Sequence, residues 1–120
     1  MIMVTAIIQP FRLERVREAL QAAGIPGLTV CPCAGHGRDP RMVPSFHDGP
    51  QVAEIVSGIR IETAVARSML RTAVAAIVQG ARIDGSGAGK IFVSPLERVV
   101  SIRTGADERD SQQALQDAAE

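Results

Sequence analysis

The first third of the chain passes from a strand-like to a helix-like pattern of apolar residues and back. Residues 4–9 are rich in β-branched side chains, which favour a strand, and Pro10 ends that run. Apolar side chains then recur at helical spacing as far as Ala23, and Gly24 is placed to end the helix. Residues 28–34 again favour a strand, so this part of the chain predicts strand, helix and strand.

The second half repeats this succession. Residues 59–65 favour a strand, the apolar positions within 69–78 keep the i, i+3, i+4 spacing of a helix, and Gly80 is its expected stop. Residues 90–93 favour the next strand. Two such units predict an α+β fold of the ferredoxin-like βαββαβ type, with two helices on one face of a four-stranded sheet. Because much of each strand is apolar, we expect the bare face to be buried against copies of the chain.

Between the two halves, residues 39–57 carry three prolines and few apolar side chains. A loop of that length is unusual in so small a domain, and such loops are commonly functional. A tolerated linker is the alternative.

Composition fits a single domain and narrows the classes of partner. The chain has 120 residues, 46% of them hydrophobic, which is enough to bury a core. Its formal net charge of zero argues against a sequence-independent grip on DNA or anionic lipid, and without Trp or Tyr it lacks a stacking platform for single-stranded nucleic acid. No apolar run reaches the roughly 18 residues of a membrane span and no secretory leader opens the chain, so a cytoplasmic protein is expected.

The one lysine of the chain, Lys90, directly follows the glycine-rich run 84–89. Glycines let backbone N–H groups approach an anion, and an ammonium at the rim adds a compact charge, so this placement indicates a phosphate site. The run is not a Walker A loop, because Lys90 enters a strand where that motif needs a helix. Arg103 is expected to supply a second cation from a strand at 99–104, on the same face as Ser101. A solvated lysine and an exposed arginine are the alternative interpretation.

Cys31 and Cys33 flank Pro32 and should point to the same face of their strand. With His36 nearby they form a candidate copper or zinc site, although no second cysteine pair completes the usual set of four ligands. Two buried thiols are the favoured alternative, because free cysteine is among the most buried residue types.

Four stretches of the sequence together resemble the PII signal-transduction proteins. They are Ala-Ile-Ile-Gln-Pro-Phe at 6–11, Gly-Ile-Pro-Gly-Leu-Thr-Val at 24–30, Gly-His-Gly-Arg at 35–38, and the glycine turn, Lys-Ile-Phe-Val and Arg-Thr-Gly between 85 and 105. The resemblance implies a homotrimeric regulator with a PII-like domain over 1–105, a T-loop over 39–57 that docks on a target, and a polar tail over 106–120. The chain shows no nucleophile-base-acid pattern and no paired carboxylates, so we expect that it is not an enzyme.

The resemblance also implies an adenine-nucleotide site, for ADP, AMP or ATP, in the clefts between subunits. The positions that match the family's site are Thr29, Gly35, Gly37, Arg38, Glu62, Ala64, Gly87, Ala88, Gly89, Lys90 and Arg103. In the resembling proteins the arginine at position 38 reaches the phosphates from the adjacent subunit. Occupancy of the site would set the T-loop conformation that is offered to a target protein, a transporter or an enzyme.

Several positions depart from the family's usual pattern. Ala88 stands where the family usually has Asp, and Ser101 where it has a second arginine. Because the second cation is missing, affinity for the triphosphate should fall more than affinity for di- or monophosphate. Asp39 and Gly58 stand where the family has a glutamine and a lysine that help to hold magnesium and 2-oxoglutarate, and the chain has no tyrosine for uridylylation. We therefore expect a divergent PII-like member, and the carboxysome-associated branch that responds to bicarbonate is one candidate. A nitrogen-regulatory PII and a trimeric metal-binding protein of the same fold stay open as alternatives, as does a role for magnesium.

Overall fold

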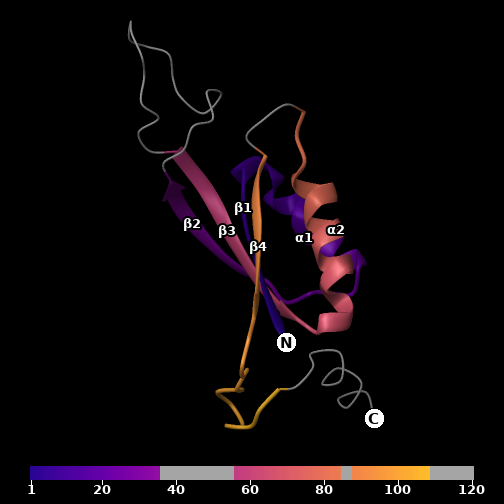
Figure 1. The fold of residues 1–120 in the computed structure, drawn as a ribbon. Helices are drawn as coiled ribbons and strands as arrows, with labels where there is room; N and C mark the ends of the chain where they lie inside the picture. The colour runs from indigo at the N-terminus through magenta and orange to yellow at the C-terminus, as the bar shows by residue number, and fades with distance from the viewer. Residues whose placement is uncertain (36–55, 85–87, 109–120) are drawn as a thin grey trace, which may run out of the picture.

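The computed structural model describes residues 1–35, 56–84 and 88–108. Figure 1 shows that its elements follow the predicted order. They are β1 (Ile2–Ile8), α1 (Leu13–Ala22), β2 (Thr29–Gly35), β3 (Val56–Val65), α2 (Leu70–Ala81) and β4 (Gly89–Pro95), with a 3-10 turn ahead of each helix at Pro10–Arg12 and Arg67–Met69. The predicted α+β fold of βαββαβ type is confirmed. Within the described ranges, neither helix is long and apolar enough to cross a membrane.

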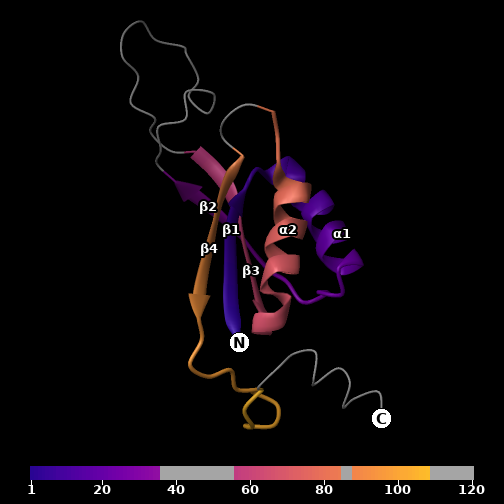
Figure 2. The ribbon, with the colours of Figure 1, turned by 45° about the vertical axis from the view of Figure 1, so that its right-hand side comes forward.

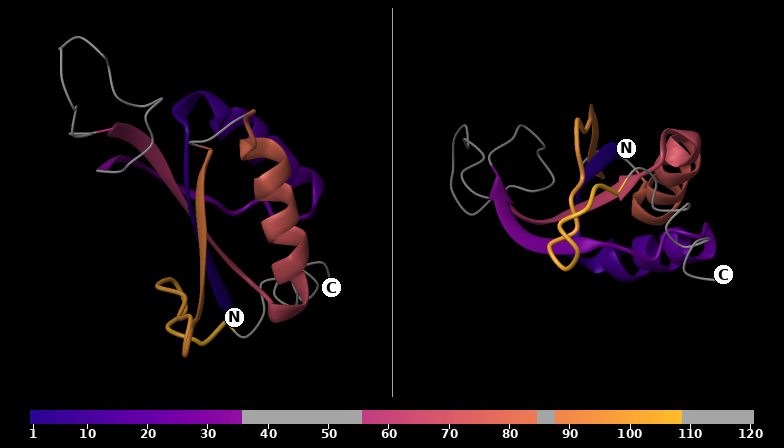
Figure 3. Two further views of the ribbon diagram at one scale, coloured as in Figure 1. Left: turned by 45° about the horizontal axis from the view of Figure 1, so that its top comes forward. Right: turned by 90° about the horizontal axis from the view of Figure 1, so that it is seen from below.

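The strands form one antiparallel sheet in the order β2-β3-β1-β4, so β2 and β4 are its edges. Both helices cover the same face of the sheet, as Figures 2 and 3 show from three further directions. The residues of β1 that point toward the helices are buried, and they are Ile2, Val4, Ala6 and Ile8. The alternate residues of each strand therefore point to a face that carries no helix.

The core lies between the sheet and the helix pair. Val16 and Leu20 of α1 and Ile77 of α2 are at most 1% exposed, and they pack on the buried residues of β1 and β3. Burying an aliphatic side chain of this size contributes about 1.5–3 kcal/mol. Thr63 is buried among them, and its hydroxyl donates a hydrogen bond of 2.7 Å to the carbonyl of Gly27. This bond ties β3 to the turn between α1 and β2.

Gly24 ends the first helix as predicted. Its φ of +84° is a conformation that glycine adopts without strain, and its N–H donates to the carbonyl of Gln21 at 3.0 Å. The next N–H, of Ile25, donates to Leu20 at 2.9 Å, which completes a Schellman motif. Ile25 is buried, so the motif turns the chain back toward the core before β2 begins.

Gly80 is not the stop of the second helix, and that prediction is wrong. The helix continues through Ala81, and Arg82 leaves it in an extended conformation. Gly80 instead lies against the backbone of α1: a Cβ placed there would be 2.7 Å from Cα of Val16 and 2.8 Å from its N atom. The glycine is needed because the two helices approach closely at this point.

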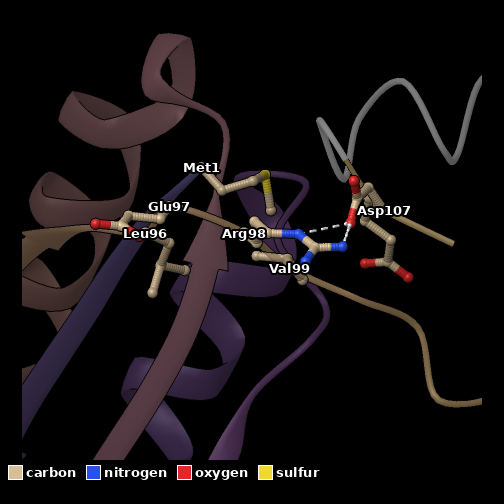
Figure 4. Close-up of a pocket in the computed structure, with 7 residues that line it drawn as sticks. Met1, Leu96, Glu97, Arg98, Val99 and Asp107 are labelled. Atoms are coloured by element: carbon tan, nitrogen blue, oxygen red, sulfur yellow. Dashed lines mark hydrogen bonds and ion pairs between the residues drawn. The ribbon is translucent and has the colours of Figure 1, made fainter. Parts of the chain in front are cut away.

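Residues 99–104 do not form the predicted strand. Beyond β4 the chain makes a short hairpin closed by a bridge between Val100 and Asp107 and by a hydrogen bond of 3.0 Å from Ser101 N–H to the Ala106 carbonyl. Arg98 donates to Asp107 at 2.8 and 3.2 Å across the mouth of this hairpin (Figure 4). The alternating pattern suits a strand, but within the described residues the hairpin pairs only with itself. The sequence alone could not show that this segment finds no neighbouring strand to pair with among the described residues.

Candidate nucleotide site

The helix-free face of the sheet gathers most of the predicted site residues that the structure describes. The positions that the pairing register places on this face include Thr29, Cys31, Cys33 and Gly35 of β2, Gly58, Arg60, Glu62 and Ala64 of β3, Met3, Thr5 and Ile7 of β1, and Lys90, Phe92 and Ser94 of β4. Directly paired residues of antiparallel strands point to the same face, which is why four strands contribute to one surface.

Lys90 reaches this face because β4 starts very close to the backbone of β1. Gly89 has a φ of +111°, and a Cβ on it would lie 1.8 Å from the carbonyl oxygen of Ile7, so only glycine fits there. Lys90 is the next residue and pairs with Ile7, and its side chain is exposed. The glycine therefore determines where the ammonium group is presented.

Ala88, Gly89 and Lys90 also line a cavity of about 300 Å³ at the end of α2. Its floor is apolar and includes Ile8, and Arg82 joins Lys90 in its lining. Two cations beside an apolar floor suit a ligand that has both an anionic and an apolar part. The sequence analysis did not select Arg82, although its place between the helix and the glycine run was a usable signal.

A second group of predicted site residues lies at the β2 side of the sheet. Thr29 pairs directly with Glu62, and Ala64 follows on the same face of β3. Arg60 contacts Glu62 through its Nε at 3.4 Å, and both side chains are partly exposed. This group offers a hydroxyl, a carboxylate and a small apolar side chain, which suits the polar edge and the flat face of a heterocyclic base.

The structure does not bring the two groups together within one chain. Lys90 and Thr29 lie on opposite edge strands, three strand spacings or about 14 Å apart. Arg103 belongs to the hairpin beyond Pro95, whereas Lys90 follows the first residue of β4, so the two cations lie toward opposite ends of that strand (Figures 1 and 2). Gly37, Arg38 and Gly87 lie outside the described residues, as do 39–55 of the predicted T-loop.

The cysteines point to the same face of β2, as predicted. Both are free, and both are only partly buried in the single chain, so the expectation of two buried thiols is not met there. Among the described residues no group of three or more potential metal ligands is found, and His36 lies outside them.

A second hollow, of about 250 Å³, lies between the N-terminus and the hairpin (Figure 4). Met1 and Leu96 line it on one side and the pair of Arg98 and Asp107 on the other. None of the predicted site residues that the structure describes lies in it, and besides the ion pair its lining includes the carboxylates of Glu97 and Glu108.

Comparison with known proteins identifies the family. The family model for nitrogen regulatory protein P-II matches residues 1–106. The chain belongs to the PII family. Nitrogen regulatory protein P-II of Cereibacter sphaeroides is 42% identical over 108 residues, which cover 90% of this chain and 96% of that protein. Nitrogen regulatory protein GlnK of Escherichia coli strain K12 is 40% identical over 107 residues, covering 88% of this chain and 96% of GlnK.

A solved structure agrees with this assignment. The crystal structure of Arabidopsis thaliana PII bound to citrate superposes with a TM-score of 0.72 at 30% identity, covering 89% of this chain and 84% of that one. PII proteins are trimeric regulators of partner proteins, they bind adenine nucleotides, and they are not enzymes. The resemblance drawn from the sequence motifs is confirmed, as is the expectation that the chain is a regulator.

Proposed function

We propose that this PII protein is a homotrimer that binds ADP, AMP or ATP in clefts between its subunits and controls a target protein, a transporter or an enzyme, through its T-loop, predicted over 39–57, of which residues 56 and 57 belong to β3. The observation that carries the proposal is the division of the site residues between the two edges of one sheet. Ala88, Gly89 and Lys90 lie at the β4 edge, and Thr29 lies at the β2 edge. A complete site would need both edges.

A closed ring of copies provides that arrangement. Rotation about a common axis sets one surface of each chain against a different surface of the next, so the β4 edge of one copy can face the β2 edge of its neighbour. The apolar character of the helix-free face supports such packing: Phe92 is 54% exposed in the single chain, and Met3 and Ile7 are only partly buried. Large exposed apolar side chains on one face favour association.

The hairpin after β4 supports the same arrangement. Ile102 is fully exposed and Val100 is 45% exposed, which is costly unless another surface covers them. Arg103 follows Ile102 directly, so a neighbour that covers the hairpin would also receive a cation. In this proposal Arg103 completes the phosphate site of another copy rather than the site that contains its own Lys90.

The cations present favour the less charged nucleotides. Ser101 stands where the family usually has an arginine, which removes one charge-assisted contact. Such a contact contributes on the order of 1.5–3 kcal/mol, and the triphosphate depends on it most. ADP or AMP is therefore the expected main ligand, and titration with and without Mg²⁺ tests whether the ion adds to the affinity for ATP.

Light scattering and calorimetry test the proposal. Scattering after gel filtration should give three times the 12.7 kDa chain mass. Lys90→Ala and Arg103→Ala should each weaken ADP binding by roughly tenfold or more, because each removes a charge-assisted contact. Arg71→Ala, which removes an exposed cation from α2, is the control and should leave the affinity unchanged. A stable monomer, or full affinity in both site variants, would contradict the proposal.

Two effectors are candidates for the second ligand. The names of the relatives support a nitrogen-regulatory role, for which 2-oxoglutarate would raise the affinity for ATP. Gly58 argues against 2-oxoglutarate, because a glycine offers no ammonium to its second carboxylate, and the bicarbonate-responsive, carboxysome-associated role is the other candidate. Titrating the nucleotide with 2-oxoglutarate or with bicarbonate separates the two roles, because only the true effector changes the nucleotide affinity.

A further inference from the structure

Cys31 and Cys33 are the only cysteines of the chain, and they lie side by side on the helix-free face of β2. Cys31 pairs directly with Arg60, and Cys33 pairs with Gly58. Both thiols are free and partly exposed, and β2 is an edge strand of the sheet. None of the residues assigned to the nucleotide gives these thiols a role.

The spacing of the two thiols suits a bridging ion better than a disulfide. Alternate residues of a strand are about 6.6–6.8 Å apart at Cα, which is the upper limit for a disulfide with its S–S bond of about 2.05 Å. Metal–thiolate bonds of about 2.3 Å let two sulfurs stand up to roughly 4.6 Å apart on either side of one ion. Side chains that point to the same face can reach that separation without moving the backbone.

The surface beside Cys33 leaves room for an ion. A Cβ added to Gly58 would lie 3.5 Å from the Cys33 sulfur, so any side chain at position 58 would occupy the space next to that sulfur. Within one chain, glycine leaves this side of the sulfur uncovered. The nearest side chain beyond it is that of Ile7, whose Cγ2 lies 3.4 Å from the same added Cβ. The site is therefore bounded by the two thiols, by the apolar surface at Ile7 and, beside Cys31, by Arg60.

Charge favours a monovalent ion. Two thiolates and Cu(I) form a unit of net charge −1, whereas two thiolates and a divalent ion are neutral. Arg60 pairs with Cys31, and its contact with Glu62 uses Nε, so its terminal nitrogens can donate to a thiolate. Thiolates are the soft ligands that select Cu(I), and a two-coordinate ion needs no third ligand.

We propose that Cys31 and Cys33 form a two-thiolate site for Cu(I) on the helix-free face of β2. Binding replaces two S–H protons by one copper ion: two thiols and Cu⁺ give a bis-thiolate complex of charge −1 and two protons, and copper stays in the +1 state throughout. Proton release is therefore part of the binding reaction.

Competition with a chromophoric Cu(I) chelator tests the proposal on the untagged, fully reduced full-length protein under argon. The wild type should retain one Cu(I) per chain and release two protons for each ion. Cys31→Ser and Cys33→Ser should each weaken binding by roughly 100-fold or more, since losing even an indirect support of a metal ligand costs 10–100-fold. Ala34→Ser adds the same hydroxyl on the opposite face of β2 and should bind as the wild type does.

Two further readings make the test specific. Arg60→Gln should weaken Cu(I) binding by about tenfold and leave Zn²⁺ binding unchanged. X-ray absorption of the copper-loaded wild type should show two sulfur ligands. One copper for every two or three chains would place the ion between subunits, and binding that persists in both serine variants would place it elsewhere; either result overturns the proposal.

The same proteins keep this site separate from the nucleotide site. Cys31→Ser and Cys33→Ser should bind ADP as the wild type does, and Lys90→Ala should retain copper. Failure of nucleotide binding with retained copper would contradict the proposed function alone. Loss of copper with intact nucleotide binding in the wild type would contradict the thiolate site alone.

Discussion

Replacing Gly80 by alanine sets two effects of opposite sign against each other. Gly80 lies within α2, and alanine is more favourable than glycine in a helix by about 0.5–1 kcal/mol. Against this, the new Cβ would lie 2.7 Å from Cα and 2.8 Å from N of Val16, and 3.0 Å from the carbonyl carbon of Arg15. Ordinary contact begins near 3.4 Å, so α1 would have to withdraw by about 0.7 Å.

The packing effect should win. All three contacts are backbone atoms, which cannot turn away as a side chain does. Withdrawing α1 also loosens Val16 and Leu20, which are buried against the sheet. Overpacking costs typically about 1–3 kcal/mol, and a forced backbone shift lies at the upper end of that range. We therefore expect Gly80→Ala to lower the free energy of unfolding by about 2 kcal/mol.

Urea unfolding measures this difference. All variants are compared at one chain concentration, because association contributes to the stability of an oligomer. Ala75→Gly, on the exposed face of the same helix, is the control and should cost about 1 kcal/mol from helix propensity alone. If Gly80→Ala unfolds at a higher urea concentration than the wild type, propensity dominates and the close helix contact does not constrain this position.

Three further predictions address single contacts. Gly89→Ala should lower the free energy of unfolding by well over the roughly 1–2 kcal/mol of a left-handed alanine, because its Cβ would overlap a β1 carbonyl. Gly24→Ala has open space around it and should lower the free energy of unfolding by only that amount. Equal urea midpoints for the two variants would refute this prediction. Thr63→Val should lower the free energy of unfolding by about 0.5–1.5 kcal/mol, because it removes the part-buried hydrogen bond to the Gly27 carbonyl, and Thr63→Ser should restore most of the loss in the same assay. The hydrogen bond from Arg17 lowers the pKa of the Glu14 carboxyl. The contribution of this bond to the stability of the fold is therefore present above the ordinary carboxyl range and is lost as the pH falls through the lowered pKa. In an NMR titration, Arg17→Met should return the pKa of Glu14 to its usual range.

The fold was predictable because apolar spacing reports which side of each element is buried. The helical spacing within 13–22 places Val16 and Leu20 in the core that the structure buries, whereas β1 is apolar on both faces and only the structure shows which of its alternate residues are buried. Gly80 is a position at which the spacing of apolar residues does not decide the structure. A glycine near the end of a helical pattern can end the helix or admit a neighbouring backbone, and only the position of Val16 decides between the two.

The sequence yields the candidate site as a set of residues, which stays a prediction, but it does not yield their arrangement. The glycine run before Lys90 indicates a phosphate from local chemistry alone, and the register explains why Glu62 shares its face. The prediction of a strand at 99–104 was wrong although the residues do alternate, because no strand in the described part of the chain pairs with them. A pattern can specify a pleated, half-buried segment, but it cannot say whether the surface that buries it belongs to the same chain.

The division of the site between two sheet edges makes nucleotide binding and trimer assembly inseparable in the proposed function. A ligand that binds only the assembled state stabilises it by RT ln(1 + [L]/Kd), or about 2.7 kcal/mol for each site at a hundredfold excess over Kd. Saturating ADP should therefore keep the trimer intact at chain concentrations where the free protein dissociates, as measured by mass photometry across a dilution series. Lys90→Ala should lose most of this protection at the same ADP concentration. Cu(I) should give none, because both of its ligands come from one strand. If ADP binds with undiminished affinity to the dissociated chain, the site is complete in one subunit, and the 14 Å that separate the two edges of the sheet must be spanned in some other way.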